Sequence, residues 1–272
     1  MELTLTYSRN LHQPATVQAL ASTLVSTLRA LIDGRASEDA ARFTPADFPL
    51  ARLTPALLQR LSSQLPPFED LYPLSPMQQG ILFHALLEPS STAYFVQSSM
   101  ALHSASLDVD AFHAAWKALL SHHPILRTSF LWEGLEEPLQ VVHRHASMEW
   151  TQHDWRHLPQ PQQQRLLEVE LEADRARGFD FSRPPLMRLM LVRLGESSYR
   201  LVWSQHHLLL DGWSLGLLFQ EFFAAYEALR SGRTPHLPQH PPLRDYIAWL
   251  RERTHSQAEA FWREALSGIS SP

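Results

Sequence analysis

The spacing of apolar positions predicts a chain in which helices and strands alternate. Apolar residues that recur every three or four positions are expected on the buried face of an amphipathic helix, and short alternating or continuous apolar runs are typical of strands. The predicted helices are residues 14–32, 76–84, 109–120, 159–177, 213–229, 243–250 and 258–266, with a short helical pattern that ends at residue 61. The predicted strands are residues 3–8, 94–102, 125–130, 139–143, 148–150, 186–194 and 199–210. This mixture predicts an α/β fold.

Local signals predict where several helices begin and end. Thr16 and Asp108 are candidate N-caps, because their side-chain oxygens can accept a hydrogen bond from the first helical turn. Ser75 precedes a proline at the first position of a helical pattern, and Gly34 is expected to end the first helix.

One predicted strand ends in residues that can carry chemistry. The apolar run 199–210 contains His206 and His207, and it is followed by the turn signal Asp211-Gly212 and a helical pattern. Loops between a strand and a helix often present reactive side chains. Because successive strand residues point to opposite faces, at most one of the two histidines can face a site.

Three strings of residues resemble the core motifs of one family. Residues 204–214, SQHHLLLDGWS, are similar to the HHxxxDG motif of the chloramphenicol acetyltransferase superfamily, and most of all to that of nonribosomal peptide synthetase condensation domains. Residues 72–84, YPLSPMQQGILFH, resemble the first core motif of these domains, and residues 122–130, HHPILRTSF, resemble the second. Two positions depart from the motifs, because Gly80 and His122 stand where many members carry arginine.

The resemblance covers residues 70–272 and implies the N-terminal lobe of a chloramphenicol acetyltransferase-like α/β fold, in which a mixed sheet is flanked by helices. We expect the second lobe to be absent, since the sequence stops near the midpoint of such a domain, and we expect the piece alone to be inactive. Residues 1–45 resemble the C-terminal remnant of an upstream domain of the same superfamily. Residues 46–69 resemble an interdomain linker.

The resemblance implies a role for each of five residues. His207 would be catalytic, either as a general base or by holding the attacking amine, and His206 would pack beneath it. Asp211 would brace the loop, and Gly212 would leave room for a pantetheine arm or for a close backbone turn. Arg127 matches the arginine that family members pair with the motif aspartate, so we expect a bidentate ion pair between Arg127 and Asp211.

The implied function is amide formation in a nonribosomal peptide synthetase. A donor thioester and an acceptor aminoacyl amine would arrive on the phosphopantetheine arms of upstream and downstream peptidyl carrier proteins. Adjacent synthetase domains would be further partners, and no cofactor would be bound directly. Gly80 resembles members that follow an epimerization domain, and residues 1–50 resemble the C-terminal end of an upstream superfamily domain, often an epimerization domain. Together these resemblances predict a D-configured donor and an L-configured acceptor.

Two alternatives remain open from the sequence. An epimerization domain shares the motif and would use His207 to move an α-proton, although the residues after the motif glycine favour condensation. The chain could instead be a carrier-protein interaction fragment without activity. A Ser-His-Asp hydrolase is disfavoured, because no GxSxG elbow accompanies Ser204 or Ser214.

Composition excludes several other classes of protein. The formal net charge is −5, and no basic run is present of the kind that follows a nucleic-acid backbone. The absence of cysteine excludes disulfides and thiolate metal sites. No apolar run is long enough to span a bilayer and the N-terminus does not resemble a signal peptide, so we expect a cytoplasmic protein with no membrane contact.

A metal site is not expected either. His143 and His145 share a strand face, but no carboxylate or third histidine stands near them at a ligand spacing.

Overall fold

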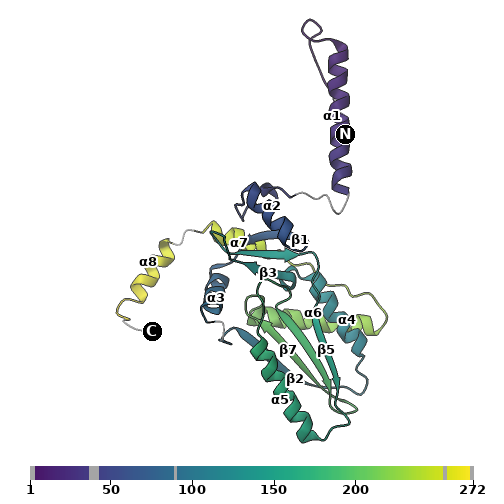
Figure 1. The fold of residues 1–272 in the computed structure, drawn as a ribbon, viewed down its shortest axis with the longest axis vertical. Coiled ribbons are helices and arrows are strands. Elements are labelled where there is room, and N and C mark those ends of the chain that lie inside the picture. Colours follow the sequence, from purple (N-terminus) through teal and green to yellow (C-terminus); the bar gives the residue numbers. More distant parts are fainter. Residues whose placement is uncertain (1–3, 37–42, 89–90, 254–255, 270–272) are drawn as a thin grey trace. The chain divides into compact units, whose positions relative to one another are not determined.

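The computed structural model describes residues 4–36, 43–88, 91–253 and 256–269 (Figure 1). The chain forms two compact units, Met1–Asp47 and Phe48–Pro272. The first holds the helix α1 (Pro14–Ala36) and the 3-10 turn η2 (Pro45–Asp47), and the second holds both sheets.

The first unit corrects three local predictions. α1 begins at Pro14 rather than after Thr16, since proline suits a first turn whose backbone N–H groups have no intrahelical partner. The helix continues past Gly34, because one glycine costs a helix only about 1 kcal/mol relative to alanine. Residues 4–8, predicted as a strand, have no regular secondary structure, since a strand requires a neighbouring ladder. Residue 3 lies outside the described residues.

The second unit contains two sheets. The four-stranded sheet has the order β2 (Phe95–His103), β7 (Ser198–His206), β6 (Met187–Arg193) and β5 (Glu149–Asp154). The three-stranded sheet has the order β1 (Phe68–Pro73), β4 (Leu139–His143) and β3 (Thr128–Leu131). β5 and β6 are parallel, whereas every other pair is antiparallel. The four-stranded sheet is therefore mixed, as predicted.

The helices of the second unit lie at the positions in the chain that the apolar pattern indicated. The helical elements of the second unit, in its described part, are α2 (Pro55–Gln64), α3 (Pro76–Leu87), α4 (Val109–His122), the 3-10 turn η3 (Pro124–Arg127), α5 (Gln160–Arg177), α6 (Gly212–Arg230), α7 (Leu243–Arg251) and α8 (Ser256–Ala265). Asp108 caps α4 as predicted. The predicted helix start at Ser75 and Pro76 is confirmed, and Ser75 forms a capping box there. No described helix is both long enough and apolar enough to cross a membrane.

The main core lies between the four-stranded sheet and the pair α4 and α6. Trp116 of α4 is fully buried, and its ring lies 5.3 Å from Trp203 of β7 and 4.7 Å from Phe222 of α6, measured between ring centroids. The apolar residues of α4 on this side are buried as well: Phe112, Ala115, Leu119 and Leu120. Each aromatic side chain buries a large apolar area, so this packing holds α6 on the sheet.

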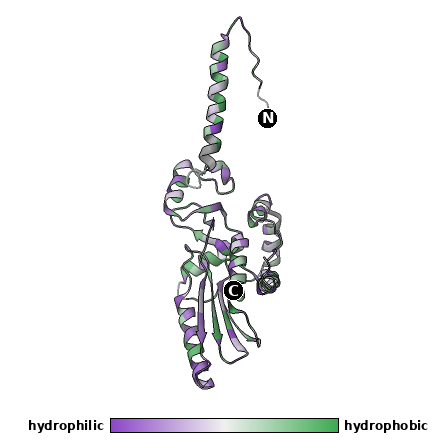
Figure 2. Ribbon diagram, turned by 90° about the vertical axis from the view of Figure 1, so that its right-hand side faces the viewer, coloured by the Kyte–Doolittle hydropathy of each residue, from purple (hydrophilic) through white to green (hydrophobic). Residues whose placement is uncertain are grey.

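α5 covers the opposite face of the same sheet. Ser204 follows Trp203 on β7 and donates a hydrogen bond to Asp174 of α5, so the two neighbouring side chains point to opposite faces. Gln97 of β2 also donates to the carbonyl of Leu171 in α5, at 3.1 Å. α5 carries hydrophilic residues along much of its length, consistent with one solvated side (Figure 2).

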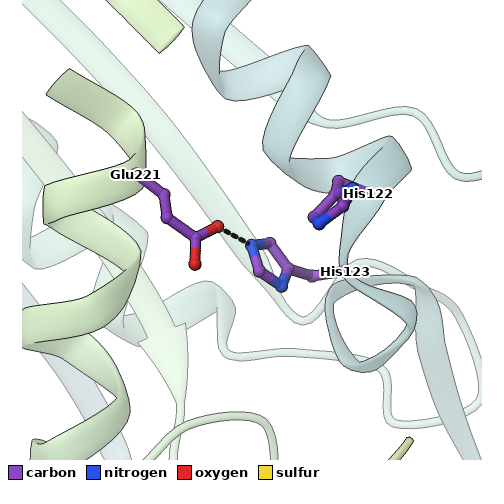
Figure 3. Close-up of side chains that lie close together, drawn as sticks. All are labelled: His122, His123 and Glu221. Atoms are coloured by element: carbon purple, nitrogen blue, oxygen red, sulfur yellow. Dashed lines mark hydrogen bonds and ion pairs between the residues drawn. The ribbon is translucent and has the colours of Figure 1, made fainter. Parts of the chain in front are cut away.

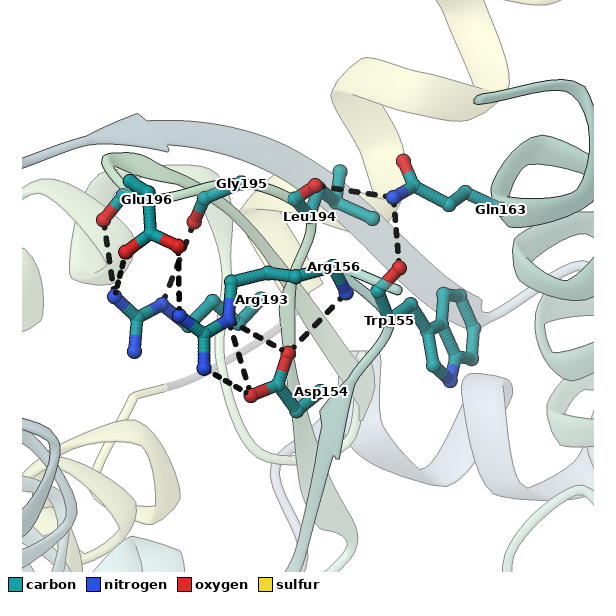
Figure 4. A network of polar contacts seen from close by, with 8 residues as sticks. All are labelled: Asp154, Trp155, Arg156, Gln163, Arg193, Leu194, Gly195 and Glu196. Atoms are coloured by element: carbon teal, nitrogen blue, oxygen red, sulfur yellow. Dashed lines mark hydrogen bonds and ion pairs between the residues drawn. The ribbon is translucent and has the colours of Figure 1, made fainter. Parts of the chain in front are cut away.

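A polar network fixes the start of α5 to the edge of the sheet (Figure 4). Gln163 is buried, and its amide donates to the carbonyls of Trp155 and Leu194 at 2.8 and 3.0 Å. Nearby, Arg156 bridges Asp154 and Glu196 on the surface. Exposed ion pairs contribute at most about 1 kcal/mol, so the buried glutamine is the more important link.

Arg127 lies in the three-stranded part of the fold and does not pair with Asp211, so the predicted ion pair is wrong. Its side chain is buried and donates to the carbonyls of His143 and Arg144 and, at 3.0 Å, to Glu69 of β1. It also ends the turn η3 rather than lying within the predicted strand 125–130. The carbonyls and the Glu69 carboxylate supply partners for both terminal nitrogens of the guanidinium, so its charge is balanced without Asp211.

Asp211 is used in a different way. It is the N-cap of α6, and its carboxylate accepts hydrogen bonds from the backbone N–H of Ser214 at 2.8 Å and from the Ser214 hydroxyl at 2.7 Å. A cap is a local arrangement that orders few additional residues, so the helix start is satisfied without Arg127.

The two corrected roles predict different losses of stability. Asp211→Ala should lower the free energy of unfolding by about 0.5–2 kcal/mol, because one N-cap is lost. Arg127→Ala should lower it by roughly 2–6 kcal/mol, because two carbonyls lose their buried donor. Urea denaturation of both single variants and the double variant measures these losses. The loss in the double variant should equal the sum of the two single losses. A coupling energy above about 1 kcal/mol would instead support a direct ion pair between Arg127 and Asp211.

Candidate active site

The site is built where β7 stops pairing with β2. Phe95 is opposite His206 in the ladder, and the backbone N–H of His207 donates to the carbonyl of Tyr94 at 3.0 Å. The predicted strand 199–210 therefore ends at His206. The chain then turns, with Leu209 N–H donating to the carbonyl of His206 at 3.0 Å. The three leucines that follow His207 are buried in this turn. The apolar run therefore continues beyond the end of the strand.

The two histidines occupy opposite environments. His206 is 5% exposed, and its ring lies against Phe181, with ring centroids 4.8 Å apart, and farther from Tyr94. His207 is exposed. His206 is the last residue of β7, whereas His207 lies in the turn that follows, where the chain leaves the sheet.

Burial keeps the His206 imidazole neutral. It lowers the pKa of His206 from its ordinary 6.5 to about 4, and the neighbouring His207 acts in the same direction. The backbone N–H of Leu208 lies 3.3 Å from Nδ1 of His206, so Nδ1 accepts and the proton of the neutral ring is on Nε2.

A backbone carbonyl determines the tautomer of neutral His207. Its Nδ1 lies 3.1 Å from the carbonyl oxygen of Leu210, which can only accept a hydrogen bond. Nδ1 therefore carries the proton, and Nε2 keeps its lone pair on an exposed side chain. This is the tautomer that a base or a hydrogen-bond acceptor for an incoming amine requires.

Asp211 and Gly212 shape the start of α6 beside this imidazole. Hydrogen bonds from the side chain and backbone of Ser214 hold the pKa of the Asp211 carboxyl below its ordinary value, so the cap stays ionised near neutral pH. Gly212 does not have a positive φ, and a Cβ built on it meets nothing within 4 Å. A close backbone turn is thus not the reason for glycine here, and the space next to it is open.

Gln78 is a residue of the site that the sequence analysis did not single out. Its amide donates to the carbonyl of Leu208 at 3.0 Å, and it forms a reciprocal pair with Gln140, with N–O distances of 3.1 and 3.0 Å. Gln78 also accepts from the backbone of Ser75 in the capping box. The capping pattern is visible in the sequence, whereas the contact with the loop after His207 is not.

Comparison with known proteins matches the chain to one family. The Condensation domain family model matches residues 68–271. One of the linear gramicidin synthase proteins of Brevibacillus parabrevis is 44% identical over 272 residues, which is 100% of this chain and 5% of that protein. Bacitracin synthase 1 of Bacillus licheniformis is 33% identical over 274 residues, covering 99% of this chain and 5% of its own length.

Solved structures agree on the fold. The starter condensation domain of rhizomide synthetase RzmA matches with a TM-score of 0.64 at 20% identity, over 75% of this chain and 50% of that one. The first condensation domain of the calcium-dependent antibiotic synthetase, in complex with a substrate analogue, matches with a TM-score of 0.64 over 73% of this chain and 48% of that one. The chain belongs to the condensation domain family of nonribosomal peptide synthetases.

Proposed function

We propose that this chain supplies the catalytic histidine of a condensation domain that joins two carrier-bound substrates through an amide bond. The observation that carries the proposal is the exposed His207, whose Nδ1–H is donated to the carbonyl of Leu210 so that Nε2 is free to accept. The family assignment supplies the substrate class, a thioester donor and an aminoacyl acceptor.

The reaction requires an unprotonated amine. An α-amino group has a pKa near 7.7–8.0, so at neutral pH much of the acceptor is ammonium and must lose a proton before it attacks. His207 Nε2 accepts the proton or holds the amine by a hydrogen bond. The amine nitrogen then forms a bond to the thioester carbonyl carbon, the carbon–sulfur bond breaks, and the released pantetheine thiol takes up a proton. General-base assistance of this kind typically contributes about 10²–10⁴ in rate.

Residues around His207 would act by positioning. Leu210 fixes the ring through its carbonyl, and Gln78 holds the same turn through the carbonyl of Leu208. A reactive group held in attacking geometry gains rate without any change in its own chemistry. The open space beside Gly212 fits the approach of a pantetheine arm.

The partners we propose are the peptidyl carrier proteins on either side, whose phosphopantetheine arms deliver donor and acceptor, together with adjacent synthetase domains. Residues 1–45 would belong to the end of an upstream superfamily domain, and residues 46–69 to the linker. Support comes from relatives that are much longer synthases, and the match to linear gramicidin synthase extends over these N-terminal residues as well.

Removal of the His207 imidazole should abolish most of the activity and leave the fold intact. In the synthetase that carries this chain, we expect His207→Ala to lower kcat for amide formation between loaded carriers about 10²–10⁴-fold, with an unchanged melting temperature because the side chain is exposed. His145→Ala, at another exposed histidine, is the matched control.

Retention of more than a tenth of the activity in His207→Ala would contradict the catalytic role. The same assay in deuterated water tests the epimerization alternative. Incorporation of deuterium at the donor α-carbon without amide formation would contradict condensation and support epimerization as the function.

We infer that the donor is D-configured and the acceptor L-configured, on the basis of Gly80 and residues 1–50. Competition between D- and L-terminated donors for one L-acceptor should give mainly the product of the D-donor, because an inverted centre misplaces the thioester and a shift of about 1 Å can cost 10²-fold in rate. Gly80 is exposed and a Cβ there meets nothing within 4 Å, so the Gly80→Arg variant should fold. It should reduce the preference for the D-donor over the L-donor. Preferential use of the L-donor would overturn the stereochemical inference and leave condensation standing.

The buried His206 predicts acid sensitivity of the fold. The pKa of His206 is about 4 in the folded protein and has its ordinary value of 6.5 in the unfolded chain. Between these pH values the unfolded state binds more protons, so the free energy of unfolding falls as the pH drops from 6.5 toward 4. His206→Asn keeps an acceptor for Leu208 N–H but does not titrate. Between pH 7 and 4.5 this variant should lose about 2–3 kcal/mol less than wild type in urea denaturation. Parallel losses in both proteins would contradict the shifted pKa.

A further inference from the structure

A second group of polar side chains lies at the C-terminal end of α4, within the second unit (Figure 3). One ring nitrogen each from His122 and His123 and one carboxylate oxygen of Glu221 on α6 all lie within 4.8 Å of one another. Two histidines and a glutamate form a ligand set that zinc accepts. The end of α4 adds partial negative charge, which favours a cation there.

The hydrogen bond of His122 prepares one of its nitrogens for a metal. Nε2 of His122 lies 2.7 Å from the carbonyl oxygen of Pro238, so Nε2 must donate and Nδ1 of the neutral ring keeps a lone pair. Metal-binding histidines usually donate their other N–H in this way to a carbonyl or a carboxylate.

Glu221 is oriented from its other side. The residue is 7% exposed, and its two oxygens lie 2.7 Å from Nε2 of His123 and 2.5 Å from Nε2 of His240. Within the described part of the chain, both ion pairs of this carboxylate are with imidazoles and none is with arginine or lysine. His240 thus holds one oxygen while the other faces His123.

The burial of Glu221 favours a cation beside it. In the described part of the chain no arginine or lysine pairs with this carboxylate, so a divalent cation would supply a full positive charge next to it.

We propose that His122, His123 and Glu221 bind a zinc ion, with His240 as the residue that orients Glu221. Zinc bonds of about 2.0–2.2 Å place ligand atoms about 3.3 Å apart, so the His122 side chain would move toward the other two ligands. Zinc would also displace the proton of the hydrogen bond between His123 and Glu221. A water completes four ligands. The bound ion would fasten the loop 233–242, which contains four prolines and includes His240, to α4 and α6.

This proposal is independent of the proposed condensation activity, since Glu221 lies nine positions beyond Gly212 on α6 and the ligands do not include His207. It departs from our expectation of no metal site. That expectation considered only ligands at short spacing, whereas His123 and Glu221 are 98 residues apart.

The test is metal binding to the untagged chain after removal of metal with a chelator. Titration with Co²⁺ should give the visible absorption of a four-coordinate site at one equivalent, and Zn²⁺ should displace it and raise the melting temperature. His122→Gln should abolish the absorption, and His240→Ala, which keeps all three ligands, should weaken affinity about 10–100-fold. His157→Ala, at an exposed histidine outside the group, is the matched control and should bind as wild type does.

His122→Gln changes a partly exposed side chain, and its fold can be verified by circular dichroism independently of metal. Absence of a one-equivalent transition in the wild-type chain would overturn the proposal. Equal binding by wild type and His122→Gln would overturn it as well, since the metal would then be held by other histidines.

Discussion

The site depends on the residue at which β7 stops pairing with β2. The ladder ends with Phe95 opposite His206, and one further hydrogen bond, from His207 N–H to the carbonyl of Tyr94, fixes the next residue before the chain turns. This end point leaves the first imidazole packed at the end of the strand and the second in the turn, where it is exposed. A shift of the register by one residue would exchange the two environments, so that His206 would be exposed and His207 buried.

Backbone groups of one short turn determine the protonation of both imidazoles. The N–H of Leu208 points to Nδ1 of His206, and the carbonyl of Leu210 accepts from Nδ1 of His207. The three leucine side chains of this turn, Leu208, Leu209 and Leu210, are buried at 1–6% exposure, so burial of apolar area holds the turn in place. Gln78 adds a hydrogen bond to the same turn and connects it, through Gln140, to the three-stranded sheet.

Much of the fold could be predicted from the sequence, because most elements have local causes. The apolar stripe of α4, the caps Ser75 and Asp108, and the antiparallel pair β6 and β7 follow from neighbours within a few residues. Predictions failed where a local pattern lacked its partner or gained a better one. Residues 4–8 alternate as a strand does but have no neighbouring strand to pair with. Arg127 donates to the carbonyls of His143 and Arg144, at the end of β4, and not to Asp211.

The sequence by itself determined which residue types stand at the strand end and that His206 and His207 cannot share one face. Only the tertiary structure decided which histidine is exposed, what fixes its tautomer, and which distant side chains meet. Gln78 and Leu208 are 130 residues apart, and His123 and Glu221 are 98 apart. Contacts at such separations leave no periodic trace in the chain, because they arise only when the packing of helices on sheets brings the two segments together.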